Sequence, residues 1–546
     1  MAAPLGRPAS GSLSAPAVGA AAIAHNPSDS FGRNAALVAA VLGWMFDGFE
    51  IGLFPLVGPR ALDDLLAGQL AADPAAKDAW FGSIMAVFLV GAACGGVLFG
   101  WLGDRIGRVR AMSASILTYS IFTGVCGFAT DAWQIAAARF VASLGMGGEW
   151  ALGVALVSEL WPDASRPLLA GIIGAAANAG MALVAVVSLL LVSIVATARD
   201  GLLAAGLGEA TVEWLTRGDA WRLLMMAGAL PGLLVFFIRM LVPESERWEE
   251  SRAQGATSHW VTRDLLGVLG GGLAVLAIVG VWMPGGLVAR TGSGLAGAVA
   301  TLTGLGLALV GFLHPVRGYL RRAEAAGAIS ADSARRTRRH LLLAACLAGV
   351  PLMGTWGSVQ WIVKWAIALD KAAVAAGAAP AWHAKEATQI AMGIGAIVGT
   401  IVVALAAGRF GRRIAYLALC AASIASIAAL YLGFRSYGGW FLLAAAVVNA
   451  TTAGFYGWFP LVLPELFPTA VRTTAQGFAY NFGRVLAAIG SLQTAPLVAF
   501  FARGLDPTRM EVEAFPRAGL WLSAIYLLGA ALIWLIPETK GRPLPE

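Results

Sequence analysis

The sequence predicts an all-α polytopic membrane protein, in which two six-helix parallel pseudo-repeats and an inserted helix pair make about 14 transmembrane helices. Three observations predict this class. Of the 546 residues, 58% are hydrophobic and only 13% are charged, against about 25% charged residues in soluble domains. Apolar stretches long enough to cross roughly 30 Å of hydrocarbon recur from end to end. Three short motifs also occur twice, in the same order.

The composition excludes a soluble enzyme, a DNA-binding protein and a disulfide-stapled secreted module. No polar stretch is long enough to fold as an independent domain. The net charge of +7 comes from basic residues in short loops between apolar spans, so no nucleic-acid partner is expected. The four cysteines lie in or beside apolar spans without metal-ligand spacing, and we expect neither a metal nor a cofactor.

The apolar pattern divides the chain into a tail, two halves and an insert. Residues 1–32 are rich in Ala, Gly, Ser and Pro, and predict a disordered cytoplasmic tail. An N-terminal six-helix half covers 33–255, with spans at 33–57, 80–102, 110–129, 133–158, 168–197 and 221–241. An inserted pair at 264–284 and 293–314, with a basic cytoplasmic loop, covers 256–340. A C-terminal half covers 341–546, with spans at 341–368, 387–407, 414–433, 439–463, 474–502 and 518–536.

The basic residues predict the orientation of the chain. They gather in the turn from Arg105 to Arg110, in the turn from Arg409 to Arg413, and as seven arginines between Arg317 and Arg339. Cytoplasmic loops carry an excess of Lys and Arg, so we expect both termini in the cytoplasm of a multi-pass protein of the cell (inner or plasma) membrane. The seven arginines act either as an anchor of this kind or as a contact for anionic lipid.

Three repeated motifs define the two halves. Glu159-Leu-Trp-Pro-Asp-Ala-Ser-Arg166 recurs 306 residues later as Glu465-Leu-Phe-Pro-Thr-Ala-Val-Arg472. Asp104-Arg-Ile-Gly-Arg108 recurs as Gly408-Arg-Phe-Gly-Arg412, and Pro243-Glu-Ser245 recurs as Pro537-Glu-Thr539. Parallel six-helix halves of this kind are a known transporter architecture that holds its substrate between the halves.

At these residues the chain resembles the major facilitator superfamily. The stretch from Gly100 to Arg108 is similar to its signature between the second and third helices, and Arg139 to Glu149 resembles the fourth helix of proton-linked metabolite and sugar carriers. Pro243 to Trp248 and Pro537 to Arg542 resemble the sugar-carrier motifs that end each half. Trp44 to Glu50 resembles the first helix of aromatic-acid and sialic-acid symporters, and the added helix pair is similar to the sialic-acid permeases.

The chain departs from the superfamily pattern at two positions. Val109 stands where a basic residue is usual, and Gly408 replaces the acidic residue in the second copy of the basic turn. We therefore expect an asymmetric inner gate that depends on Asp104.

Charged residues inside spans are the functional candidates, because burying them in a membrane costs about 2.5–3.5 kcal/mol on insertion scales. Asp47 and Glu50 share one helix face. Asp47 and Arg139 are expected at similar depth, so the two could pair. The three residues either couple proton movement to transport, hold two helices together as a static ion pair, or face an open vestibule.

Two further groups are candidates for binding substrate in the second half. Gln360 and Lys364 share a helix face next to Trp361, which indicates either a polar pocket or an interfacial aromatic belt. Asn481 and Arg484 lie deep in the span at 474–502. Arg484 suits either a carboxylate substrate or a structural partner.

The resemblance implies a conformational gate at the basic turns. Asp104 would cap the helix that begins near Thr473, Arg108 would reach Glu465, and Glu159 would face Arg412 or Arg413. Such pairs are worth about 0–1 kcal/mol when exposed to water, which suits a latch. The other residues assigned to the gate are Arg105, Arg472 and Glu149. Glu149 lies near the cytoplasmic end of its span, and either pairs with an arginine of the gate or contacts the substrate.

The resemblance therefore implies a secondary active transporter that moves a small polar metabolite by alternating access. Proton symport of an organic acid fits the buried cations best, and the alternative is a neutral sugar moved by proton symport or uniport. A membrane enzyme is not expected, because no span carries a catalytic set. A channel or sensor on the same fold is a weaker alternative. The expected partners are the substrate, protons and the lipid bilayer, with the chain as a monomer.

Overall fold

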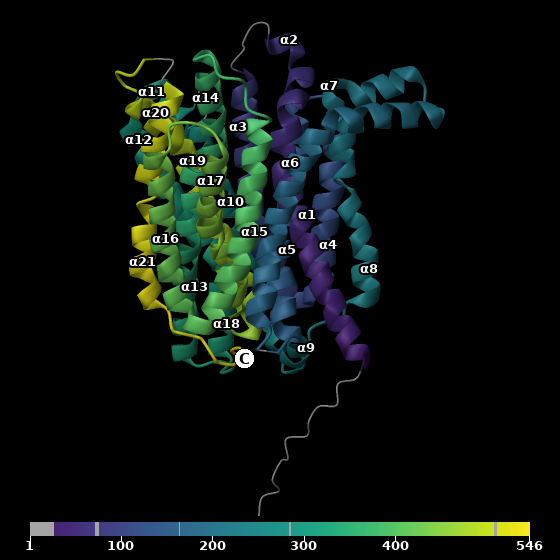
Figure 1. Cartoon of the computed structure of the whole chain (residues 1–546). Coiled ribbons are helices and arrows are strands. Elements are labelled where there is room, and N and C mark those ends of the chain that lie inside the picture. The colour runs from purple at the N-terminus through teal and green to yellow at the C-terminus, as the bar shows by residue number, and fades with distance from the viewer. Residues whose placement is uncertain (1–26, 71–75, 163, 283–285, 507–509) are drawn as a thin grey trace, which may run out of the picture.

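The structure, a computed structural model, describes residues 27–70, 76–162, 164–282, 286–506 and 510–546, and all structural statements refer to these residues. Every regular element in these ranges is helical, and most helices stand side by side in one bundle (Figure 1). We call the end of the bundle that carries the turns at Gly107 and Gly411 the motif end; it lies at the bottom of Figure 1, beside the C-terminus. The opposite end is the loop end.

The first half contains six spans. They are formed by α1(Pro27–Leu65), α3(Ala76–Ile106), α4(Arg108–Cys126), α5(Ala132–Leu160), α6(Arg166–Ala204), and a last span made of α7(Glu209–Ala227), η1(Leu230–Leu233) and α8(Leu234–Leu241). Short helices α2(Ala67–Leu70), α9(Glu246–Ala253), η2(Ala256–His259) and η3(Thr262–Asp264) connect them to one another and to the insert. The inserted pair is α10(Leu265–Trp282) and α12(Gly294–Ala325), joined by α11(Leu287–Thr291).

The second half repeats this order. Its spans are α13(Ala331–Gly354) continued through the π-helical turn η4(Thr355–Val359) into α14(Trp361–Ala375), then α15(Ala384–Phe410), α16(Arg412–Gly433), α17(Gly439–Ala453) with α18(Phe455–Leu466), α19(Arg472–Phe501), and α20(Met510–Leu522) with α21(Ile525–Leu532). The 3₁₀ turns η5(Thr469–Val471) and η6(Ile533–Leu535) flank the last spans. Thirteen helical runs in the described ranges are long and apolar enough to cross a membrane. The helix α19 is not one of these thirteen, but it packs between them, on α3 and α13. These runs confirm a polytopic helical membrane protein.

Two predicted boundaries are wrong for local reasons. Residues 27–32 of the predicted tail belong to α1, while residues 1–26 lie outside the described residues. The predicted basic loop is almost entirely helical, because its arginines occupy the end of α12 and the start of α13. Only residues 326–330 separate these helices: Gly327 turns the chain with φ +72°, and the Ser330 hydroxyl caps α13 by accepting the Ser333 N–H at 3.2 Å.

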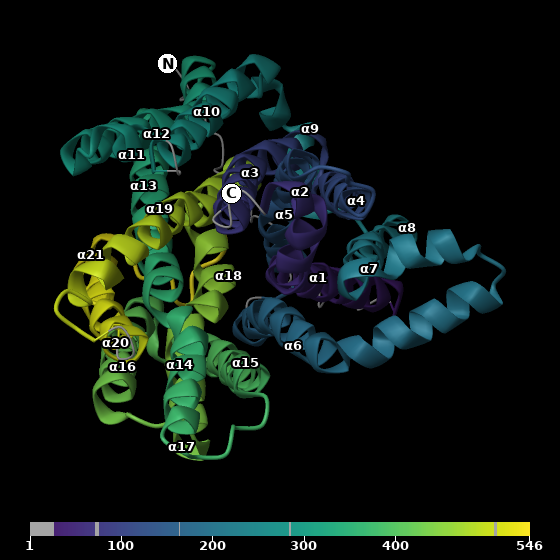
Figure 2. The same cartoon turned by 90° about the horizontal axis from the view of Figure 1, so that it is seen from above.

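The two halves pack side by side, and the insert lies at the edge of their junction. Across the junction, α19 packs on α3, and α15 and α18 pack on α6. In Figure 2, α10 and α12 lie along the outer margin, where α10 contacts α3 and α12 contacts α13 and α19. Buried side chains of α1, α5 and α19 therefore meet between the halves, away from the insert.

Candidate functional site

The three repeated motifs meet at one place in the first half. The Arg108 guanidinium donates from Nε and Nη2 to both carboxylate oxygens of Glu159, each at 3.1 Å. Glu244 accepts the backbone N–H of Arg108 at 2.8 Å and of Val109 at 3.2 Å, so its carboxylate lies at the positive start of α4. Gly107 precedes this helix with φ +111°, a conformation that favours glycine.

The second half repeats the same network. Arg412 donates to the two oxygens of Glu465 at 3.1 and 2.7 Å. Glu538 accepts the backbone N–H of Arg412 at 3.0 Å and of Arg413 at 3.2 Å. Burial favours a higher pKa for Glu538, but these N–H donors outweigh it and hold the pKa below its ordinary value. Motifs that lie far apart in sequence thus build one ion network in each half.

The predicted partners of Arg108 and Glu159 are wrong. Arg108 bonds to Glu159 instead of Glu465, and Arg412 bonds to Glu465 instead of Glu159. Each arginine starts a helix that lies beside the end of the helix bearing its carboxylate in the same half. Each arginine–glutamate pair therefore lies within one half and does not by itself join the two halves.

Other contacts of the same residues do cross between the halves. Asp104 lies at the start of α19, as predicted, and accepts the backbone N–H groups of Thr473 at 3.1 Å and Thr474 at 2.8 Å. Arg472 donates to Glu159 at 2.6 Å, and Arg108 donates to the Thr469 carbonyl oxygen at 2.9 Å. The motif end of the bundle is therefore closed in this structure.

These gate contacts are buried, contrary to the prediction of pairs exposed to water. The side chains of Arg108, Glu159 and Arg472 have no exposed area. Removal of one charge from a buried pair costs about 3–5 kcal/mol, well above the value for an exposed pair. Arg105 differs, because it is exposed, donates to the Thr262 hydroxyl at 2.8 Å and lies 5.0 Å from the Trp101 ring centroid. It faces the start of the insert.

The centre of the bundle contains two neighbouring carboxyl groups. Asp47 of α1 and Glu149 of α5 are 0% and 2% exposed, interact directly with each other, and have no hydrogen-bond partner that meets normal geometry among the described residues. Gly43 makes the approach possible, since a Cβ there would lie 1.6 Å from Glu149 Oε1. Glu149 therefore belongs to this central pair, and among the described residues it makes no hydrogen bond to an arginine of the gate.

Arg139 pairs with Glu50, and the predicted pair with Asp47 is absent. Its Nη1 donates to Glu50 Oε1 at 2.8 Å, and the Thr123 hydroxyl donates to the same oxygen at 2.9 Å. The guanidinium lies between the rings of Phe88 and Phe54, at 4.4 and 4.9 Å from their centroids. A shift of one helical turn along α1 thus separates a bonded carboxylate from an unbonded one.

Arg484 of α19 is a buried cation that acts on Asp47. It attracts Asp47 electrostatically, is 5% exposed, and lies 5.1 Å from the Tyr480 ring centroid. Its Nη1 has no hydrogen-bond partner among the described residues. Asn481, one turn after Gly477, donates to the Gly147 carbonyl oxygen at 2.9 Å, so it joins α19 to α5.

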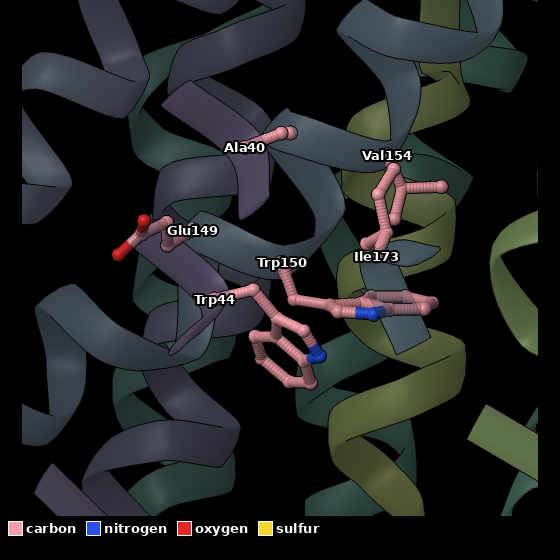
Figure 3. A pocket seen from close by; sticks show the side chains of 7 residues that line it. Ala40, Trp44, Glu149, Trp150, Val154 and Ile173 are labelled. Carbon is pink, nitrogen blue, oxygen red and sulfur yellow. The ribbon is translucent and has the colours of Figure 1, made fainter. Parts of the chain in front are cut away.

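Aromatic rings line the same place. Trp150 of α5 and Tyr480 of α19 stack with centroids 4.2 Å apart, and Trp44 lies 6.2 Å from Trp150. Trp44, Glu149 and Trp150 also border a cavity of about 10 Å³, large enough for about one water molecule. Figure 3 shows the Glu149 carboxyl pointing away from the two indole rings.

The other predicted binding residues lie apart from this group. The Gln360 amide donates to the Trp356 carbonyl oxygen of its own helix. Lys364 is exposed, and its ammonium lies 4.6 Å from the Trp361 ring centroid. Trp361 stacks on Phe515 of α20. Within the described residues, these three side chains contact their own helix or α20 and make no hydrogen bond to Asp47, Glu149 or Arg484.

Sequence reasoning missed Trp150, Thr123 and the stacking role of Tyr480. Two signals were available: Trp150 directly follows a charged residue inside a span, and Tyr480 precedes Arg484 by one helical turn. Thr123 gave none, because threonine is common in membrane helices.

Two six-helix halves that enclose a buried polar site define a membrane transporter. The sequence pattern of the sugar (and other) transporter family matches residues 35–264 and 381–546. The chain belongs to this family, within the major facilitator superfamily, and is a secondary transporter of small molecules, not an enzyme.

Relatives and solved structures agree with this assignment. The cis,cis-muconate transport protein of Acinetobacter baylyi is 27% identical over 404 residues, 73% of this chain and 74% of that protein. The inner membrane metabolite transport protein YgcS of Escherichia coli is 24% identical over 457 residues, 84% and 82% of the two chains. The structure of the proton:xylose symporter XylE of Escherichia coli matches with a TM-score of 0.60 and 19% identity, over 94% of this chain and 98% of that one.

Proposed function

We propose that the chain moves a small organic acid together with protons by alternating access. One observation carries this proposal: the Asp47–Glu149 carboxyl pair is buried in the first half, where Arg484 of the second half attracts Asp47 and the ring of Trp150, the residue after Glu149, stacks on Tyr480. The carboxyl pair offers a place for a proton, Arg484 offers a charge for an anionic substrate, and the rings offer an apolar surface.

The coupling follows from charge balance. Two neighbouring carboxylates in a low-dielectric interior repel each other, so one proton shared by the pair is favoured. While the site is empty, Arg484 partly compensates the remaining negative charge. A substrate carboxylate would occupy the guanidinium of Arg484 and compete with Asp47 for it, so Asp47 would bind a proton more readily. Substrate and proton would then load together.

Alternating access also requires that one end of the bundle is closed while the other is open, and in this structure the motif end is closed. We place this end in the cytoplasm, because the basic turns and the arginines of α12 and α13 lie there. The contacts of Asp104, Glu159 and Arg472 between the halves would break when the carrier opens inward. The chain is expected to work as a monomer, in an inner or plasma membrane, as the name of YgcS supports.

The substrate class rests on the site and on a relative. The name of the muconate transport protein supports an organic acid. The family description names sugars first, so a neutral sugar, moved by proton symport or uniport, is the second candidate. A sugar would need hydrogen-bond donors and acceptors more than a free guanidinium.

The test is proton movement in proteoliposomes on addition of small acids and sugars. We expect one class of acid to drive proton uptake in the wild type. In Asp47→Asn this proton uptake is lost, while counterflow of labelled acid persists. Asp200→Asn, an exposed aspartate on α6, is the matched control and should behave like the wild type. Exchange of labelled acid without proton movement would overturn symport, and proton uptake driven by sugars alone would favour the second candidate.

A further inference from the structure

We propose that the motif end of the inserted helix pair binds the headgroup of an anionic phospholipid. A groove of about 520 Å³ lies there between the start of α10 and the middle of α12, at Val310 to His314. Arg263, Asp264 and His314 supply its polar wall, and Leu266 and Val310 supply its apolar wall. The groove is separate from the central site, and the proposal does not depend on what the chain transports.

Exposed basic side chains lie at the groove and beside it. Arg263 is exposed, and His314, Arg317 and Arg321 follow Val310 at helical spacing, so they lie on one face of α12. These side chains are exposed and can turn toward a ligand at the groove.

The one carboxylate of the groove is already paired. Asp264 accepts hydrogen bonds from Arg322, one of them from Nη1 at 3.2 Å, and Arg322 Nε donates to the His259 carbonyl oxygen at 2.7 Å. His314 Nε2 lies 4.0 Å from Asp264. The remaining charge of the exposed side chains is therefore available to an anion.

The apolar wall continues into a strip that suits an acyl chain. Leu266, Leu269 and Leu273 of α10 are 63%, 61% and 59% exposed, and Val310 is 57% exposed. The pair lies at the outer margin of the bundle, so this strip faces hydrocarbon (Figure 2). His314 is about 30 Å along α12 from its start, at 1.5 Å per residue, which places His314 and the arginines beside it near the headgroup level of a bilayer. A groove with arginines at its polar side and an apolar strip on its other side fits a lipid with a negative headgroup better than it fits a soluble anion.

The chain offers a matched control for this site. Arg335 and Arg336 are also exposed arginines of the motif end, but they lie on α13, whereas the groove is formed by α10, α12 and the turn before α10. If anionic lipid were attracted only by positive charge in general, removal of these two arginines would weaken binding as much as removal of the groove arginines. Specific binding at the groove would not be weakened by their removal.

The experiment counts lipids retained by the full-length protein in native mass spectrometry. Detergent-purified protein is incubated with phosphatidylglycerol or phosphatidylcholine of the same acyl chains. We expect preferential retention of phosphatidylglycerol, lost in Arg263→Gln/Arg317→Gln and kept in Arg335→Gln/Arg336→Gln. Val310→Trp, which fills the groove without a change in charge, should also weaken retention. Equal losses in the control, or no preference in the wild type, would overturn the site. Displacement of the lipid by inorganic phosphate would also overturn it, because the ligand would then be the phosphate alone.

Discussion

Asp47 and Glu50 show how one helical turn separates two kinds of buried carboxylate. Glu50 accepts hydrogen bonds from Arg139 and Thr123, so its negative charge is compensated in a fixed arrangement. Asp47 has no hydrogen-bond partner among the described residues and instead neighbours a second carboxyl group. Only a carboxyl group without a fixed cationic partner can gain and lose a proton at low cost, which favours Asp47 as the proton carrier.

At the residue scale, Glu50→Gln should destabilise the protein. It removes the negative charge that compensates Arg139, which has no exposed area, and loss of one partner of a buried pair costs about 3–5 kcal/mol. Thermal unfolding in detergent should show a clearly lower midpoint. Glu50→Leu/Arg139→Met removes both charges and should recover most of the loss. An unchanged midpoint together with lost proton uptake would instead assign proton transport to Glu50.

A second residue-scale prediction concerns Gly43, which leaves room for the Glu149 carboxyl group. In Gly43→Ala a Cβ would lie 1.6 Å from Glu149 Oε1, so the carboxyl group must move and its arrangement with Asp47 is disturbed. We expect at least a tenfold loss of substrate-driven proton uptake, since 1.4 kcal/mol of disturbed geometry already corresponds to a factor of ten. Gly153→Ala is the control, because its nearest neighbour is the Ala40 Cβ at 3.3 Å. Equal uptake in both variants would contradict the role of Gly43.

At the element scale, the carboxylates that cap α4 and α16 predict a pH dependence of stability. The pKa of Glu538 is held below its ordinary value of 4.5 in the folded protein. Its contribution to stability is therefore fully present above that value and is lost as the pH falls through the folded pKa. Glu538→Gln should lower the unfolding midpoint at neutral pH, and the difference from the wild type should shrink below about pH 4.3. A difference that stays constant with pH would contradict this capping role.

The elements also show what the sequence could predict. Spans were placed well because apolar length alone decides them. The start of α1 and the short connection after Gly327 were missed, because capping by Ser330 depends on local hydrogen bonds that hydropathy does not register. The Asp104 contact with α19 was predicted correctly, whereas the partners of Arg108 and Glu149 were not. Those partners depend on how helices rotate and pack, which a single sequence does not specify.

At the scale of the whole molecule, the insert and the central site are separate. The pair α10 and α12 lies at the margin, while the residues of the central site lie on α1, α5 and α19. The two ion networks likewise belong to separate halves, each closed by its own arginine and glutamate. Helices of the two halves also pack on each other along the junction, α19 on α3 and both α15 and α18 on α6. The polar contacts of Asp104 and Arg472 across the junction lie at the motif end, so they contribute to the balance between open and closed states.

This arrangement predicts opposite outcomes for two buried arginines. Arg472 joins Glu159 of the other half at 2.6 Å, whereas Arg412 bonds to Glu465 of its own half at 2.7 Å. Arg472→Gln should therefore open the motif end, and Asp104→Asn should do the same because α19 loses its anionic cap.

Glu159 keeps Arg108 as a partner in the open state, so little stability should be lost in Arg472→Gln. Arg412→Gln should lower the unfolding midpoint without opening the motif end. The measurement is reaction of a cysteine introduced in place of Thr473, which is 0% exposed and lies beside Gly100, with a reagent supplied from the motif end. Equal reactivity in Arg412→Gln and Arg472→Gln would show that the two networks act together, and that the halves do not move as separate bodies.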